Sequence, residues 1–495
     1  MMRSLFSGVS GLKTHQTRMD VIGNNIANVN TVAYKYSTMT FASLMSQTTQ
    51  RASGANATTG TGGVNARQIG LGVKTSAINI NITAQGASQS TGNPFDIMIT
   101  GENFFVVSDG KQNYFTRDGS FYVDGAGNLA MTSIGYNVMG WQPDIDPETG
   151  EVRGIKKDTV SALRIMSSAN MTYPPEATSE AYMSGIIDLN DTDVTSDGGK
   201  VVNLNFYDSL GYTYTAKFSF KQDPGDSTTN PPTPADQYKY TMKLVELQDS
   251  TGAKVPAGKL ATGANPTDEE EAKAYADLMA KLWDGDKEIQ FDKKTGKLTS
   301  LTKVGDTTQL DKTKVGLNFG ILNDSANNFA NAVDGNFQKI NLDITQLTTF
   351  DNKGTSTAGA TNGKDDKYNT GSGRRVGALI GVAIQQNGEI YASYDNGMTK
   401  LLGQIATARF ANASGLEKQA DNLYSATLNS GTFDGIGVDI TADGGYMSTG
   451  QLEMSNVDLS SEFTEMITTQ RGFQANSRII TVSDTLLEEL TNLKR

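Results

Sequence analysis

Both ends of the chain carry apolar residues at helical spacing, and the long stretch between them does not. Steps of three and four residues are the spacing by which a helix presents one apolar face to a partner helix. The residues predicted to form this seam are Leu5, Val9, Leu12, Met19, Ile22, Ile26, Phe463, Met466, Phe473, Ile480, Leu487 and Leu490. A chain that begins and ends in helices able to pair, with a body between them, is suited to be one unit of a polymer.

Charge and small residues support this pairing. Residues 1–35 carry four basic side chains and one acidic, whereas residues 458–495 carry six acidic and four basic. Opposite net charge on two amphipathic helices favours their pairing, either within one chain or between neighbouring copies. Gly8 and Gly11 each cost about 1 kcal/mol relative to alanine inside a helix. We therefore expect another helix to approach closely at these two positions.

From about residue 75 to residue 440 the sequence consists of short β-type runs broken by Gly, Asn and Asp. The pairs Asp109-Gly110 and Asn387-Gly388 are strong hairpin signals because they lie between alternating apolar runs. One helix is predicted in the middle, where Thr267 and Glu270 have the spacing of a capping box. We expect a mainly β multidomain protein with nested β domains, in which long α-helical N- and C-terminal segments pair as a coiled-coil-like inner domain.

At 495 residues the chain is too long for one hydrophobic core, so several domains are expected. The Ser/Thr/Gly/Gln-rich residues 36–75 predict a flexible linker. Ser455 is the predicted N-cap of the last helix, with Asp458 three residues later. The predicted domains are a terminal helical inner domain (1–32 and 456–495), a linker region (33–88 and 440–455), a first β domain (89–165 and 371–439), and an outer β domain (166–370) with an inserted subdomain at 222–300 that begins in a Pro-rich loop.

Composition excludes several functions. The net charge of -12 argues against nucleic acid or an anionic membrane as partner, and no run of 18 apolar residues is present to span a bilayer. Cysteine is absent, which removes disulfides and thiolate chemistry, and the single histidine, His15, is expected to be a solvated or interface residue of the first helix. The N-terminus lacks the continuous apolar core of a cleaved signal peptide. We expect no catalytic activity, no cofactor and no metal.

An acidic run at residues 188–199 resembles a calcium loop only in part, since it lacks the terminal glutamate and the glycine position of an EF-hand. Its carboxylates are Asp188, Asp191, Asp193 and Asp197. We expect a solvated surface loop.

The terminal sequences also carry a family resemblance. The run MMRSLFSGVSGLKTHQTRMDVIGNNIANVNTVAYK closely resembles the N-terminal signature of the bacterial flagellar rod and hook proteins, and residues 455–495 are similar to the matching C-terminal signature. Residues 90–107 and 415–431 are similar to the first β domain of the same family. The landmark of the N-terminal signature is the ANVNT-type segment, with the signature residues Asn25, Asn28, Asn30 and Thr31.

Within this family the insertion at 166–370 resembles that of the hook members, since rod proteins are shorter. The resemblance implies a structural hook subunit that polymerises into a curved tubular universal joint and transmits torque from rod to filament. It implies a helical homopolymer built under a hook cap protein, with a distal rod protein and a hook–filament junction protein at its two ends. It also implies an extracellular location, after export through the flagellar type III apparatus without a cleaved signal peptide.

Two further points follow from the resemblance. Phe41 and Met45 have the spacing by which export substrates dock on the exporter, although a small core cluster under the linker explains them equally well. Without cysteine, the chain cannot form the Cys-to-Lys crosslinks that join some hook proteins. The alternatives are a distal rod subunit of the basal body and, from another class, a secreted adhesin.

Overall fold

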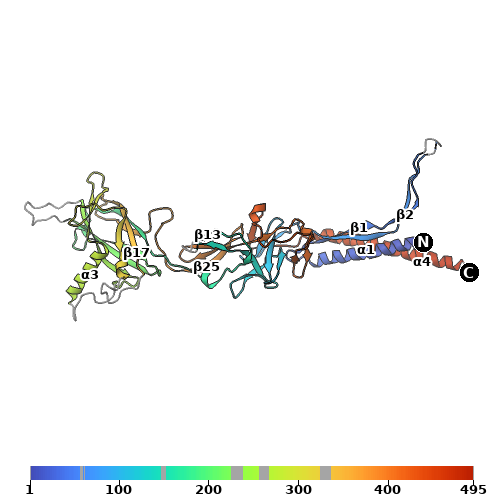
Figure 1. The fold of residues 1–495 in the computed structure, drawn as a ribbon, viewed down its shortest axis with the longest axis horizontal. Helices are drawn as coiled ribbons and strands as arrows, with labels where there is room; N and C mark the ends of the chain where they lie inside the picture. Colours follow the sequence, from blue (N-terminus) through green and yellow to red (C-terminus); the bar gives the residue numbers. More distant parts are fainter. Residues whose placement is uncertain are drawn as a thin grey trace, which may run out of the picture. The chain divides into compact units, whose positions relative to one another are not determined.

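The computed structural model describes residues 2–55, 60, 62–146, 152–223, 238–255, 267–323 and 336–493. The chain forms two compact units, one nested in the sequence of the other (Figure 1). We call them the terminal unit, which comprises residues 1–171, 380–393 and 399–495, and the central unit, which comprises residues 172–379 and 394–398. Strands dominate both units, so the predicted mainly β fold with helical ends is confirmed. Nearly all of the Pro-rich loop at 222–236 lies outside the described residues.

Two long helices end the chain. Helix α1 spans Met2–Ala27 and helix α4 spans Leu459–Asn492. The N-cap of α4 is Asp458, and the predicted cap at Ser455 is wrong. The Asp458 carboxylate accepts a hydrogen bond of 2.9 Å from the N–H of Ser460. A carboxylate interacts favourably with the positive end of the helix dipole in addition to accepting N–H groups, which favours Asp458 as the cap.

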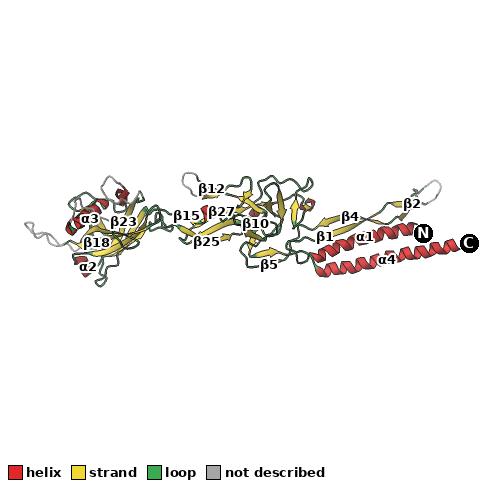
Figure 2. Cartoon of the chain, turned by 90° about the horizontal axis from the view of Figure 1, so that it is seen from below, coloured by secondary structure: helices red, strands yellow, loops and turns green. Residues whose placement is uncertain are grey.

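The segment predicted as a flexible linker contains strands instead. These are β1 (Ser37–Ser43), β2 (Ser46–Gln50), β3 (Arg67–Gly70) and β4 (Val73–Ile80). β1 pairs antiparallel with β4, and β2 pairs antiparallel with β3. Both β1 and β4 lie along α1, where Met39 of β1 is buried (Figure 2). The polar composition did not predict these strands. Threonine nevertheless forms strands readily, and β1 and β4 are also stabilised by packing on α1.

The main sheet of the terminal unit has the strand order β26-β27-β11-β7-β8-β30-β29. The hairpin of β7 and β8 turns at Asp109-Gly110, and Asn387-Gly388 lies between the neighbouring strands β25 and β26, as predicted. The core under this sheet contains Phe104, Phe115 and Tyr424. The strand bounds are β7 (Phe104–Ser108), β8 (Asn113–Thr116), β9 (Phe121–Val123), β10 (Leu129–Met131), β11 (Asn137–Trp141), β12 (Pro143–Ile145), β13 (Val152–Ile155), β14 (Ser161–Ala162), β25 (Gly377–Ile384), β26 (Glu389–Tyr394), β27 (Thr399–Ile405), β28 (Thr407–Ala408), β29 (Glu417–Lys418) and β30 (Leu423–Ser425).

Short strands connect the two flanks of the body. β5 (Ser88–Ser90) pairs with β32 (Gln451–Glu453), and β6 (Ile97–Ile99) pairs with β31 (Met447–Thr449), both antiparallel. Residues that are more than 300 positions apart in the chain are therefore hydrogen-bonded neighbours just before α4 begins. This pairing places the start of α4 next to the segment that follows α1.

The central unit contains two sheets, with the orders β17-β18-β19-β20-β21 and β22-β23-β16-β24. Helix α3 (Asp268–Leu282) begins with the predicted capping box of Thr267 and Glu270. Since β19 to β21 continue the sheet started by β17 and β18, the strands within 222–300 share that sheet and its core. The bounds are β15 (Thr172–Tyr173), β16 (Glu180–Ile186), α2 (Thr192–Thr195), β17 (Lys200–Tyr207), β18 (Thr213–Gln222), β19 (Lys239–Asp249), β20 (Lys287–Phe291), β21 (Leu298–Lys303), β22 (Val315–Asn318), β23 (Lys339–Thr348) and β24 (Gly359–Asn362).

The acidic run differs from the predicted solvated loop because Asp188 and Asp191 are buried. The Asp188 carboxylate accepts hydrogen bonds from the backbone N–H groups of Asn352 and Gly354, at 2.6 and 2.8 Å. Burial alone would raise the pKa of Asp188, but these N–H donors outweigh it and lower the pKa. The buried carboxylates of this run thus fasten two loops of the central unit together.

Candidate assembly site

The terminal helices α1 and α4 pack against each other in antiparallel orientation (Figure 2). Near the start of α1, the Ser4 hydroxyl lies 3.4 Å from that of Ser483 in the second half of α4. Two-thirds of the way along α1, Arg18 forms an ion pair of 2.9 Å with Glu465 in the first turns of α4. The predicted pairing of the two ends therefore exists within one chain.

Glycines let the two helices approach closely. A Cβ atom on Gly11 would lie 2.8 Å from the side chain of Asn476, and one on Gly8 would lie 3.1 Å from Ile480. In return, a Cβ atom on Gly472 of α4 would lie 2.8 Å from the ring of His15. The expectation that Gly8 and Gly11 mark a close helix contact is confirmed.

We expect Gly11→Leu to lower the free energy of unfolding of the terminal unit by about 1–3 kcal/mol, because the larger side chain overpacks the contact with Asn476. Urea unfolding followed by circular dichroism at 222 nm measures the change. Gly23→Leu is the matched control, since no atom lies within 4 Å of a Cβ at Gly23 and the substitution gains helix propensity. Identical unfolding curves for the two variants would contradict the close-contact assignment.

The residues of the predicted seam do not all share one environment. Ile22 is buried, with 2% of its surface exposed. The half-buried members are Leu5, Leu12, Met19, Ile26, Met466, Phe473, Ile480 and Leu487. The exposed members are Val9, Phe463 and Leu490, at 53%, 50% and 48%. The periodicity therefore marked two faces, of which one packs inside the chain.

The exposed members are part of a larger set of exposed apolar side chains on the two helices, which we call the outer stripe. It comprises Phe6, Val9, Leu459, Phe463, Ile467, Ile479, Val482, Leu486 and Leu490. Nine large apolar side chains exposed on two packed helices favour an interaction site. Polar residues meanwhile occupy part of the face toward α1, where Glu462, Thr469 and Ser483 are buried.

Asn25 organises the end of α1. Its side chain is buried and donates to the carbonyl of Ser37 at 2.9 Å, while its carbonyl oxygen accepts from the N–H of Ser37 at 3.0 Å and from the Tyr34 hydroxyl at 3.3 Å. This amide thus pairs with the backbone of β1 as another strand would. Asparagine can make these bonds because its amide offers both a donor and an acceptor.

The other signature residues form the turn that follows α1. The Asn28 amide donates to the carbonyl of Asn24 at 2.9 Å, and the Thr31 hydroxyl donates to the side-chain oxygen of Asn28 at 3.1 Å. Asn30 is exposed. These contacts explain why a run of Asn and Thr ends the helix and turns the chain toward β1.

Phe41 and Met45 have different surroundings in the folded chain. Phe41 packs edge-on against His15, with ring centroids 5.7 Å apart, and the Arg18 guanidinium lies 5.2 Å from the centre of the Phe41 ring. Met45 is 81% exposed. The ring of His15 lies against Gly472 of α4 and Phe41 of β1, so this histidine is in the interface. Burial and the nearby Arg18 charge lower its pKa.

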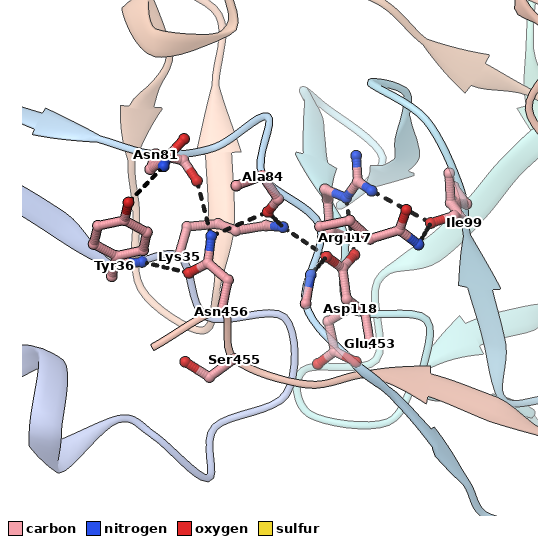
Figure 3. Close-up of polar contacts among 12 residues, drawn as sticks. Lys35, Tyr36, Asn81, Ala84, Ile99, Arg117, Asp118, Glu453, Ser455 and Asn456 are labelled. Atoms are coloured by element: carbon pink, nitrogen blue, oxygen red, sulfur yellow. Dashed lines mark hydrogen bonds and ion pairs between the residues drawn. The ribbon is translucent and has the colours of Figure 1, made fainter. Parts of the chain in front are cut away.

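A buried ion cluster lies where the segments next to the two helices meet (Figure 3). Glu453, at the end of β32, accepts from Lys35 at 2.6 Å and from Arg117 at 3.0 Å, and all three side chains are at most 1% exposed. Glu453 Oε1, which accepts from Lys35, also accepts a hydrogen bond from the N–H of Gly86 at 2.8 Å. The carboxylate is therefore hydrogen-bonded at both oxygens, as a buried charge requires.

Backbone carbonyl groups complete the cluster. Lys35 donates to the carbonyl of Ala84 at 2.6 Å, and Arg117 donates to the carbonyls of Gly101 and Asn103 at 2.7 and 3.1 Å. Burial lowers the pKa of Lys35, Glu453 opposes that shift, and Arg117 adds to it. The cluster joins the segment after α1, the first β hairpins and the segment before α4 at one point.

No local sequence signal marks Lys35, Arg117 and Glu453. Lys35 and Glu453 lie 418 positions apart, and each is a lone charge beside an apolar run. The hints of a structural role are positional: Lys35 is the last residue of the N-terminal signature run, and Glu453 lies two residues before the C-terminal signature. Sequence reasoning missed the cluster because its members become neighbours only through the pairing of β5 with β32.

The described residues contain no group of three or more histidine, aspartate or glutamate side chains arranged to hold a metal ion. Among the helices of the described chain, none is long and apolar enough to cross a membrane.

Both ends of the chain and part of its body match models of known protein families. Residues 5–35 match the family model described as Flagella basal body rod protein. Residues 98–180 match the model Flagellar hook protein FlgE/F/G D1 domain, and residues 448–493 match Flagellar basal body rod FlgEFG protein C-terminal. The ion cluster and both helices thus fall within or beside matched segments.

Individual relatives cover the whole chain. The flagellar hook protein FlgE of Treponema pallidum is 33% identical over 515 residues, with 100% of both chains covered. That of Borreliella burgdorferi is 33% identical over 513 residues, again with 100% of both chains covered. The flagellar basal-body rod protein FlgG of Bacillus subtilis is 27% identical over 495 residues, at the same coverage. At this identity over the full length, the chain belongs to the flagellar hook protein FlgE family.

Proposed function

We propose that this protein is the structural subunit of a bacterial flagellar hook and that it polymerises through its paired terminal helices. The outer stripe carries this proposal. Its apolar side chains are exposed in the single chain, and a neighbouring copy that covers them removes that surface from water. A contact between two different surfaces of identical copies does not close on itself and generates a helical filament.

In this proposal the residues of the assembly seam have two different roles. Residues such as Ile22 and Ile480 hold α1 and α4 together within one copy, while Val9, Phe463 and Leu490 of the outer stripe contact neighbours. The chain passes four times between the terminal unit and the central unit, and each is compact by itself. A separate compact unit outside the paired helices suits a tube that bends while its inner helices stay engaged. The resulting polymer is the curved universal joint that passes torque from rod to filament.

Partners and location follow as part of the same proposal. The copies assemble beneath a hook cap protein, and the tube meets a distal rod protein at one end and a hook–filament junction protein at the other. The chain reaches the outside of the cell through the flagellar type III apparatus without cleavage of a signal peptide. Phe41 and Met45 act in export before folding, since Phe41 contacts His15 once the chain has folded. The protein has no catalytic role.

A distal rod subunit is the second candidate, supported by the similarity to the rod protein FlgG. The hook function is favoured because the hook relatives are 33% identical to this chain, compared with 27% for the rod protein, at the same coverage. No observation in the described chain favours a secreted adhesin.

Electron microscopy tests the proposal. The full chain at high concentration is expected to form tubes, and a variant that lacks residues 1–32 and 456–495 is expected to form none. Immunogold labelling of intact cells with an antibody to residues 166–370 should mark a short curved segment between envelope and filament. Label within the envelope would indicate the rod, and label over the whole cell surface would indicate an adhesin.

A further inference from the structure

A pocket of about 270 Å³ opens between α1, β1 and the first turns of α4. Three carboxylates line it, those of Asp458, Glu462 and Glu465, and Arg18 is the one basic residue among its lining residues. Two of the carboxylates already have partners, because Glu465 pairs with Arg18 and Asp458 caps α4. The pocket therefore has an excess of negative charge.

Glu462 is the unusual member of this group. Its side chain is 8% exposed, and its Oε2 atom is buried without a hydrogen-bond partner. Burial raises the pKa of Glu462, the Asn25 amide opposes the shift, and the charges of Glu465 and Asp458 add to it. A buried carboxylate oxygen without a donor is costly, so the single chain leaves this group unsatisfied.

A metal ion does not explain the pocket, since no metal-binding arrangement of acidic and histidine side chains occurs in the described residues. A guanidinium group does fit the chemistry, because it offers several donors in a planar fork and tolerates partial removal from water better than an ammonium group. The missing group is therefore a basic side chain.

The exposed cations of the helix pair are Arg3 and Lys13 on α1 and Arg471 and Arg478 on α4. Arg471 and Arg478 are exposed, and neither side chain has a hydrogen bond or ion pair within the described chain. At 1.5 Å per residue they lie about 14 and about 24 Å along the helix from Glu462, too far for one side chain to reach back. Arg478 stands one turn before Val482 of the outer stripe, so it lies beside the surface proposed to contact a neighbour.

We propose that the pocket at Glu462 binds the guanidinium of Arg478 from α4 of a second copy of this chain. This inference rests on the proposed function, because it names a contact of the same polymer. The outer stripe supplies apolar contact area, and this ion pair fixes the axial register between copies. Register needs such a directional contact, because an apolar stripe alone tolerates sliding along the helix.

Cysteine cross-linking tests the contact directly, since the chain has no native cysteine. Ser461→Cys places a thiol on the pocket rim, and Gln474→Cys places one a single turn before Arg478. Within one copy these positions are about 20 Å apart along α4, too far for a disulfide. Oxidised polymers of the double variant should yield a ladder of covalent multimers, whereas the free chain and both single variants should not. Polymers that give no ladder would overturn the contact.

Charge exchange provides the second test. Glu462→Arg and Arg478→Glu are each expected to raise the concentration needed for polymerisation about tenfold, because each places like charges opposite one another. The double variant should polymerise at the wild-type concentration, because opposite charges then face each other again. Lys111→Glu is the matched control, since Lys111 is an exposed cation at the turn of the β7–β8 hairpin, outside both this pocket and the two helices. Recovery with Arg471→Glu in place of Arg478→Glu would overturn the choice of arginine. A wild-type chain that never polymerises would refute the proposed function itself, whereas normal polymers from both single variants would refute this contact alone.

Discussion

Replacement of Glu453 by alanine is expected to lower the free energy of unfolding of the terminal unit by about 3–5 kcal/mol, the usual cost of breaking a buried ion pair by removal of one partner. The substitution leaves Lys35 and Arg117 as neighbouring positive charges with almost no exposed surface. It also removes the acceptor for the Gly86 N–H. The loss should therefore exceed that of any single exposed ion pair in the same unit.

The two tryptophans make this measurement selective. Trp141 lies in the terminal unit and Trp283 in the central unit, so a Trp283→Phe background reports unfolding of the terminal unit by fluorescence in urea. Glu465→Ala is the control, because its ion pair with Arg18 is partly exposed and is worth about 0.2–1 kcal/mol. Equal midpoints for Glu453→Ala and Glu465→Ala would show that the cluster does not hold the unit together.

The second large effect separates the two faces of the helix pair. Ile22→Asp is expected to cost about 3–4 kcal/mol of stability in the free chain, because it places a charge at a position with 2% exposure. Val9→Asp should change the stability of the free chain by less than about 0.5 kcal/mol, since Val9 is 53% exposed. Both variants should fail to form tubes, the first through unfolding of the pair and the second through a charge in the outer stripe.

Urea unfolding of the free chains and electron microscopy of concentrated samples give the two readouts for each variant. Lys111→Asp is the control for a new carboxylate, since Lys111 is exposed at the turn of the β7–β8 hairpin and belongs to neither helix. Normal tubes from Val9→Asp would show that the outer stripe is not the surface between copies. Wild-type stability of Ile22→Asp would show that α1 and α4 are not paired in the free chain.

Local features were predictable wherever short-range chemistry decides the structure. The capping box of α3 and the turn at Asp109-Gly110 each depend on a few adjacent residues. The cap of α4 was predicted at Ser455 and lies at Asp458, because both residue types can cap a helix and only the folded geometry selects between them. The segment 36–75 was predicted as a linker, because its polar composition reveals neither β1 and β4, which pack on α1, nor the exposed hairpin of β2 and β3.

The sequence by itself determined that both ends are helices with apolar faces and that the body between them is β, because periodicity and turn residues act over a few positions. It also determined that glycines at 8 and 11 serve a close helix contact. Only the tertiary structure decided which part of each apolar face packs within the chain and which remains for a neighbour, as the contrast between Ile22 and Val9 demonstrates. The ion cluster was likewise decided by the tertiary structure. The pairing of β5 with β32 brings Glu453 to Lys35, which lies 418 positions away in the chain. No local sequence pattern carries information over that separation.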